Sequence, residues 1–173
     1  MTTIQRSLIV DRDIRDVFEI MYTKNETIFK NIFNILEWEK NEWKMQRNKK
    51  KRKEIIYLYI PDLPDELVSY LVENDKYLKL EIKSKILVDT PNYQKIKTKF
   101  RMLNVNPVLR TILENLELVK MKNVIELRSD SNQKTSINIK AVAKLYVPNT
   151  KSISNFMINI SEKMIVSLLD SLK

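Results

Sequence analysis

The sequence predicts an α+β fold in which antiparallel strands pack against a long C-terminal helix, with short helices after the first strand. Alternating apolar and polar residues at 78–102 and at 119–147 predict two β-hairpins, each with one buried and one solvated face. Apolar residues at spacings of three and four from Ile153 to Leu172 predict the helix. The 173 residues have the length of one domain, so we expect a single domain over 1–173.

The chain begins with a predicted strand and two predicted helices. β-branched residues dominate 3–10, as is typical of a strand. Asp11 or Asp13 is placed to cap the following helix, because a short carboxylate accepts the free N–H groups of a first turn. A second helix is expected from Glu26 to Leu36. The apolar faces of the two helices would consist of Ile14, Val17, Phe18 and Met21, and of Ile28, Phe29, Ile32, Phe33 and Leu36.

The middle of the chain changes to a period of two. Trp38 and Trp43 flank an expected turn, and a basic run follows at 47–53. A compact strand is expected from Glu54 to Ile60, where Pro61 stops it. Residues 64–72 are expected to form a short helix with Pro64 at its first position.

The two hairpins give the clearest pattern in the sequence. In the first, apolar positions on both strands alternate with lysines across a turn at 90–92; in the second, the turn lies at 129–132. A short helix is expected between the hairpins, from Val108 to Leu113. Without glycine, Asn and Asp must supply the turn positions with positive φ. Thr150 or Ser152 is expected to cap the final helix, which at about 30 Å could cross a whole sheet.

Missing residue types exclude many kinds of site. Without Cys and His, the chain cannot build a zinc finger, a Cys- or His-based nucleophile or a Ser–His–Asp triad. Without Gly, it lacks the phosphate-binding loops that need backbone free of Cβ. No constellation of acids predicts a catalytic or metal site, so we expect neither an enzyme nor a cofactor or metal. The sequence has no signal-peptide or transmembrane pattern, which predicts a cytoplasmic location.

The net charge of +9 is concentrated in one segment, and it falls to +3 without the six cations of 47–53. These cations are Arg47, Lys49, Lys50, Lys51, Arg52 and Lys53. The segment has three interpretations: contact with an anionic membrane surface, binding of nucleic acid, or a solvated hairpin turn. The last is slightly favoured and nucleic acid is the least favoured partner. Lysines on the outer faces of the first hairpin are interpreted as a solvated surface.

The order of elements resembles the START-like, or helix-grip (SRPBCC), superfamily over nearly the whole chain. The resemblance is carried by a strand followed by Asp11–Phe18, the two tryptophans, the two hairpins and the final helix. The segment Arg52–Pro64 is also similar to a stretch of VASt and PRELI-type lipid-transfer domains. The resemblance implies a curved sheet that wraps the C-terminal helix. It also implies a cavity between them for a lipid, a sterol or a similar apolar ligand, and the chain departs from it in having no glycine in its bends.

The expected function is therefore the binding, and by extension the transfer, of an apolar ligand. The expected ligand-binding residues are Tyr57, Ile82, Ile86, Phe100, Ile139, Phe156, Met157, Ile160 and Met164. Two alternatives stay open: a protein-binding scaffold with a filled core, and nucleic-acid binding through 47–53. For the apolar stripe of the last helix, plain core packing is an equally good interpretation, and a buried Tyr57 could simply satisfy a backbone partner.

Overall fold

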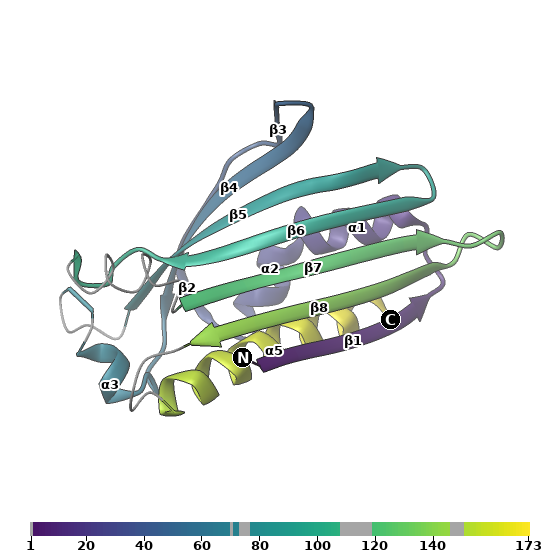
Figure 1. Ribbon diagram of the computed structural model, residues 1–173. Coiled ribbons are helices and arrows are strands. Elements are labelled where there is room, and N and C mark those ends of the chain that lie inside the picture. Colours follow the sequence, from purple (N-terminus) through teal and green to yellow (C-terminus); the bar gives the residue numbers. More distant parts are fainter. Residues whose placement is uncertain (1, 70, 73–76, 108–118, 146–150) are drawn as a thin grey trace.

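An antiparallel sheet forms one layer of the molecule and helices lie against its concave face (Figure 1). The structure is a computed structural model that describes residues 2–69, 71–72, 77–107, 119–145 and 151–173. Within these residues the strand order is β1-β8-β7-β6-β5-β4-β2, and β3 pairs with β4 beyond β2. The predicted fold class, a curved antiparallel sheet gripping a long C-terminal helix, is confirmed.

The strands are β1 (Thr2–Val10), β2 (Asn34–Lys40), β3 (Lys44–Gln46), β4 (Lys49–Tyr59), β5 (Tyr77–Thr90), β6 (Tyr93–Met102), β7 (Val119–Ser129) and β8 (Thr135–Leu145). The helices are α1 (Ile14–Tyr22), α2 (Asn25–Lys30), α3 (Asp65–Val68) and α5 (Lys151–Leu172).

The first strand and the first helix are confirmed. β1 pairs with β8, so the first and the last of the described strands are neighbours in the sheet. Asp13 is the N-cap of α1, and its carboxylate accepts hydrogen bonds from the backbone N–H groups of Arg15 and Asp16, both at 2.9 Å. Ile14 and Val17 of α1 are buried, as their helical spacing predicted.

The second predicted helix is wrong beyond Lys30. Residues 34–40 form β2 instead, and β2 pairs with β4 along the edge of the sheet. The apolar residues of 28–36 fit a helical spacing, but the exposed edge of β4 gains backbone hydrogen bonds only if this segment is extended. Leu36 lies at a register shift in β2 and is 54% exposed, so it does not belong to an apolar helix face.

The predicted turn between Trp38 and Trp43 is also wrong. β2 and β3 pair with β4 in the same direction, so residues 41–43 interrupt one edge strand and do not reverse the chain. The reversal comes at Arg47 and Asn48, whose φ angles are 49° and 60°. β4 consequently begins at Lys49, five residues earlier than predicted. Gln133 is the third residue with positive φ in the described part of the chain, so among these three only Asn48 follows the expectation that Asn and Asp would supply such positions.

The helix predicted at 64–72 is limited to the four residues of α3, with Pro64 as its N-cap. Leu71 forms a β-bridge with Val105, and the backbone N–H of Val72 donates to the carbonyl of Asn104 at 2.9 Å. Val72 is 59% exposed. The helix predicted at 108–113 lies outside the described residues, and so does the capping side chain of Thr150 or Ser152.

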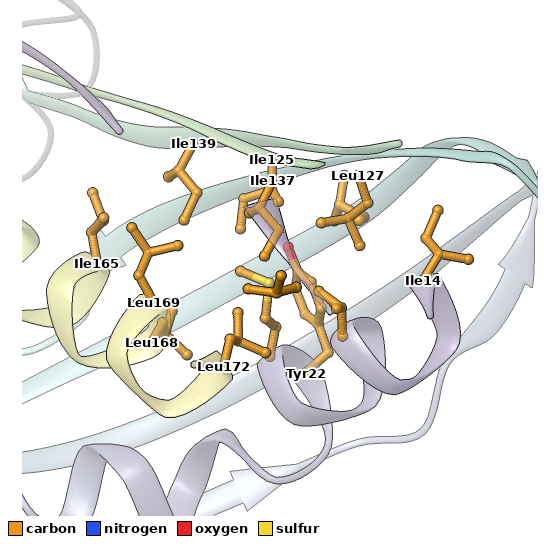
Figure 2. Close-up of a cluster of buried hydrophobic side chains, with 14 of the residues drawn as sticks. Ile14, Tyr22, Ile125, Leu127, Ile137, Ile139, Ile165, Leu168, Leu169 and Leu172 are labelled. Atoms are coloured by element: carbon orange, nitrogen blue, oxygen red, sulfur yellow. The ribbon is translucent and has the colours of Figure 1, made fainter. Parts of the chain in front are cut away.

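The two predicted hairpins, β5–β6 and β7–β8, are confirmed with their turns at 91–92 and 130–134. The long C-terminal helix is confirmed as α5. Figure 2 shows how the sheet and α5 share one core, with Tyr22 of α1 beside them. Its labelled residues are Ile125, Leu127, Ile137 and Ile139 of the sheet, Ile165, Leu168, Leu169 and Leu172 of α5, and Ile14 and Tyr22 of α1.

Candidate functional site

A cavity of about 110 Å³ lies between the concave face of the sheet and helices α1, α2 and α5. This volume is well above the ~10–15 Å³ that one ordered water molecule needs. Most of the wall is apolar. It includes Phe29, Phe33, Ile56, Leu58, Leu78, Leu80, Met121, Ile125, Ala141, Ala143, Ile158, Ile165 and Leu168. The small side chains Ala141 and Ala143 leave space that larger residues of β8 would fill.

Five of the residues predicted as ligand contacts lie in this wall: Ile82, Phe100, Ile139, Ile160 and Met164. Two other predicted contacts, Ile86 and Phe156, are not among the described residues that line the cavity, although both pack in the hydrophobic clusters around it. Met157 lies in α5, and its side chain is outside the described set.

Tyr57 is misplaced by the sequence prediction. Inward residues of β4 are Arg52, Glu54, Ile56 and Leu58, so Tyr57 lies on the opposite, outer face. There the Lys79 ammonium lies 4.8 Å from the centre of the Tyr57 ring. Successive residues of a β-strand point to opposite faces of the sheet, and the prediction assigned Tyr57 to the inner face instead of the outer face.

The sequence analysis missed a row of polar side chains across the concave face. Strand pairing places Arg52 opposite Ser84, Ser84 opposite Thr98, and Thr98 opposite Asn123. Arg52, Ser84 and Thr98 are 7%, 3% and 4% exposed, and the two hydroxyls hydrogen-bond each other at 3.1 Å. We call Arg52, Ser84, Thr98 and Asn123 the polar row. A polar inward residue at the same place on four successive strands is the signal that could have revealed it.

Arg52 does not belong to the predicted anionic-surface patch, because its side chain is buried under α1. Its Nη1 donates to the backbone carbonyl of Tyr22 at 2.6 Å, and the guanidinium lies 4.8 Å from the centre of the Trp43 ring. Its Nη2 lies 3.3 Å from Oε1 of Glu54, an ion pair in which both side chains are less than 7% exposed. Alternation along β4 explains the error: the basic run enters a strand, and this position points inward.

Glu54 and Tyr22 bring titratable groups to the cavity. Burial raises the pKa of Glu54, and the nearby Arg52 and Lys40 offset this only in part. Burial also raises the pKa of the Tyr22 hydroxyl, which lies near Thr98 and Arg52. The Tyr22 hydroxyl therefore stays protonated at neutral pH and can donate a hydrogen bond. The cavity thus combines apolar walls with groups that can hold a polar atom of a guest.

The rest of the basic run lies on the β3–β4 hairpin, where Arg47, Lys49, Lys50 and Lys53 are exposed and Lys51 is half-buried. Lys50 pairs with Asp89 at 3.2 Å and Lys53 with Glu81 at 3.0 Å. In the described part of the chain, Arg47, Lys49 and Lys51 have no ion pair. These three cations are the ones left free to meet an anionic partner.

Among the residues that the structure describes, no three acidic side chains converge as metal ligands would. None of the described helices is long and apolar enough to cross a membrane. The expected absence of a cofactor and of enzymatic activity stays a prediction.

No protein-family model matches the sequence, and no curated protein matches it. Its fold, by contrast, is similar to solved structures over nearly its whole length. A START superfamily protein from Mycobacterium smegmatis is 9% identical with a TM-score of 0.52, over 98% of this chain and 96% of that one. An aromatase/cyclase from a Streptomyces species is 12% identical with a TM-score of 0.50, over 99% and 90% of the two chains. A Thermus thermophilus protein is 6% identical with a TM-score of 0.55, over 99% and 97%.

The chain therefore has the START-like helix-grip fold that the order of its elements resembles. Its finer similarity to VASt and PRELI-type domains stays a prediction.

Proposed function

We propose that the chain binds an apolar small molecule in the cavity between the sheet and α5. The observation that carries the proposal is the cavity itself, walled by apolar side chains from the sheet, α2 and α5. Apolar walls favour an apolar guest by roughly 25 cal/mol for each Å² removed from water. A protein-binding scaffold with a filled core would have no such space, which weighs against that alternative. The fold shared with a START superfamily protein agrees with the proposal.

A gentle purification followed by mass spectrometry of the organic extract tests this function. We expect one class of apolar molecule at about one per chain, and uptake of the same class from mixed-lipid vesicles. Ile160→Trp fills the cavity from α5 and should abolish both. Val166→Trp places the same side chain on the solvent side of α5, where Val166 is 42% exposed, and should leave both unchanged. A clean extract together with no uptake would refute the function and favour the scaffold alternative.

A lipid or sterol is the guest that we propose within this class, with transfer between membranes as its use. The exposed β3–β4 hairpin supports it, because Arg47, Lys49 and Lys51 can contact anionic headgroups at about 1 kcal/mol each.

Vesicles that contain phosphatidylserine test the membrane contact by co-sedimentation. The double variant Lys49→Gln with Lys51→Gln should weaken binding, whereas Lys134→Gln, in the exposed turn between β7 and β8, should not. Binding to RNA with a steep salt dependence, but not to vesicles, would instead favour the nucleic-acid alternative.

A further inference from the structure

Four polar atoms at the cavity wall lack the hydrogen bonds that buried groups normally make. One is Oδ1 of Asn123 on β7, and the other three are the Tyr22 hydroxyl, the indole Nε1 of Trp38 and Oε1 of Glu54. Each atom is shielded from solvent and makes no hydrogen bond of normal geometry in the described part of the chain, although the Tyr22 hydroxyl lies near Thr98 and the Glu54 carboxylate lies near Trp38 and Arg52. Buried polar groups in proteins are almost always paired, so four such groups around one cavity require an explanation.

The last three of these atoms belong to one neighbourhood at the β4 side of the cavity. Glu54 lies on β4 opposite the edge strand that carries Trp38, which pairs with Ile56 two residues further along. Arg52 connects Glu54 to Tyr22, because it pairs with the carboxylate and donates to the Tyr22 carbonyl. Figure 2 shows the Tyr22 side chain rising from α1 toward the sheet, with its oxygen among the cavity's apolar residues. The three groups therefore line the same side of the cavity.

The balance of donors and acceptors indicates which polar group fits. Oε1 of Glu54 only accepts, Nε1 of Trp38 only donates, and the Tyr22 hydroxyl does both. A hydroxyl group on the guest satisfies this set, since it donates one hydrogen bond and accepts one or two.

The local charge argues against an ionised guest. Arg52 already neutralises Glu54 at 3.3 Å, so an added carboxylate would meet the Glu54 oxygens and an added ammonium would meet Arg52. Lys40, which hydrogen-bonds Asn25 at 2.7 Å, adds a second positive charge nearby. An ammonium would be buried without a free counter-charge. A carboxylate would have to compete with Glu54 for Arg52 or with Asn25 for Lys40, so burying either ion is costly.

We propose that the guest is an uncharged apolar molecule carrying a hydroxyl group, and that Tyr22, Trp38 and Glu54 bind that hydroxyl. The apolar part of the guest then lies against Phe100, Ile160 and Met164. This inference rests on the proposed function, because it names the class of molecule that the cavity takes.

A matched set of probes tests the inference by calorimetry: naphthalene, naphthol and naphthoate share their rings and differ in the polar group. Naphthol should bind about tenfold more tightly than naphthalene, as expected for one or two buried hydrogen bonds. Naphthoate should bind more weakly than naphthol. Equal binding of naphthol and naphthalene, stronger binding of naphthoate, or no binding by any of the three would overturn the inference.

Two variants assign the effect to the named groups. Tyr22→Phe removes the hydroxyl and keeps the ring that stacks on Phe18 at 5.0 Å, and Trp38→Phe keeps an aromatic ring against Phe29. Each should weaken naphthol several-fold to tenfold and leave naphthalene unchanged. Tyr93→Phe is the control, because the Tyr93 hydroxyl lies outside the cavity and donates to Glu126 at 2.8 Å.

The experiments distinguish a failure of the hydroxyl inference from a failure of the proposed function. If lipid uptake from vesicles persists while the probes show no preference for the hydroxyl, the inference is wrong and the proposed function stands. If neither uptake nor probe binding is found, the proposed function itself is wrong.

Discussion

Glu54 and Glu81 lie on paired strands, are 2% and 5% exposed, and face opposite sides of the same sheet. Glu54 points into the cavity, where Arg52 is its one ion-pair partner among the described residues. Glu81 points outward and meets three cations, at 3.0 Å (Lys53), 2.9 Å (Lys83) and 4.0 Å (Arg101). Two glutamates with similarly small exposed fractions therefore have very different charged neighbours.

The pKa shifts follow the partners rather than the exposure. Burial raises the pKa of Glu54, and the attraction of Arg52 is too small to reverse this. Burial also acts to raise the pKa of Glu81, but the hydrogen bonds from Lys83 and Lys53 outweigh it and the pKa is lowered. Glu54 faces the cavity, whereas the cations around Glu81 have exposed side chains and keep part of their hydration. On the outer face Glu81 is fully supplied with counter-charges, whereas on the inner face the Glu54 carboxylate keeps unused hydrogen-bonding capacity.

Replacing Glu54 and Glu81 one at a time should give the largest difference in stability between the two faces of the sheet. Glu54→Leu leaves Arg52 buried without a counter-charge, so we expect the free energy of unfolding to fall by about 3–5 kcal/mol. Glu81→Leu leaves cations that solvent can hydrate, and its loss should be smaller. Urea unfolding measures both, provided that the denaturant slope is unchanged.

The double variant Arg52→Met with Glu54→Leu is the matched control. It removes both charges, and most of the stability lost in Glu54→Leu should return. Equal losses for Glu54→Leu and Glu81→Leu would contradict the contrast between the two faces.

The pH dependence of stability should also separate the two glutamates, with opposite signs. The folded-state pKa of Glu54 is raised, so its contribution to stability is present below its unfolded pKa and is lost as the pH rises through the folded value. The folded-state pKa of Glu81 is lowered, so its contribution is present at neutral pH and is lost on acidification.

Thermal unfolding from neutral pH to about pH 4 measures this difference. Glu81→Gln should make the acid-side loss of stability shallower, and Glu54→Gln should make it steeper. The same slope in both variants would show that neither carboxylate has the environment described here.

The sequence predicted most of the sheet because its pattern is local. The alternation in β5, β6, β7 and β8 depends only on which neighbours face the same way. The helical spacing of α5 is equally local. Five cavity residues followed directly from these patterns.

The errors come from contacts between distant segments. Residues 34–40 form a strand because they pair with β4, and the local sequence pattern does not reveal this long-range pairing. Arg52 was assigned to the surface because it stands in a run of six cations, although it shares its inward parity with Glu54 and Ile56. Continuing the period of two from β4 back into the basic run would have placed Arg52 and Glu54 inside.

The polar row allows a smaller comparison, between inward-facing residues and their outward-facing neighbours on the same strands. Ser84 and Thr98 face inward and hydrogen-bond at 3.1 Å, so Thr98→Val leaves the Ser84 hydroxyl buried without its partner. We expect a loss of about 1–2 kcal/mol in urea unfolding. Adding Ser84→Ala should recover part of it, because the pair is then removed together. A double variant as unstable as the sum of both single changes would show that the hydrogen bond is unimportant.

The smallest effect is expected one residue away, on the outer face. Lys85 lies opposite both Lys51 and Lys97, and desolvation and the charges of these neighbours lower its pKa. Like charges directly opposite each other on paired strands repel, so Lys85→Gln should raise the melting temperature slightly at low salt. The gain should vanish at high salt, because salt screens exposed charges. Lys134→Gln in the β7–β8 turn is the control and should give no gain. A rise in melting temperature that persists at high salt would point to a change in packing rather than to relief of charge repulsion. Repulsion among the lysines would then not limit the stability of the outer face.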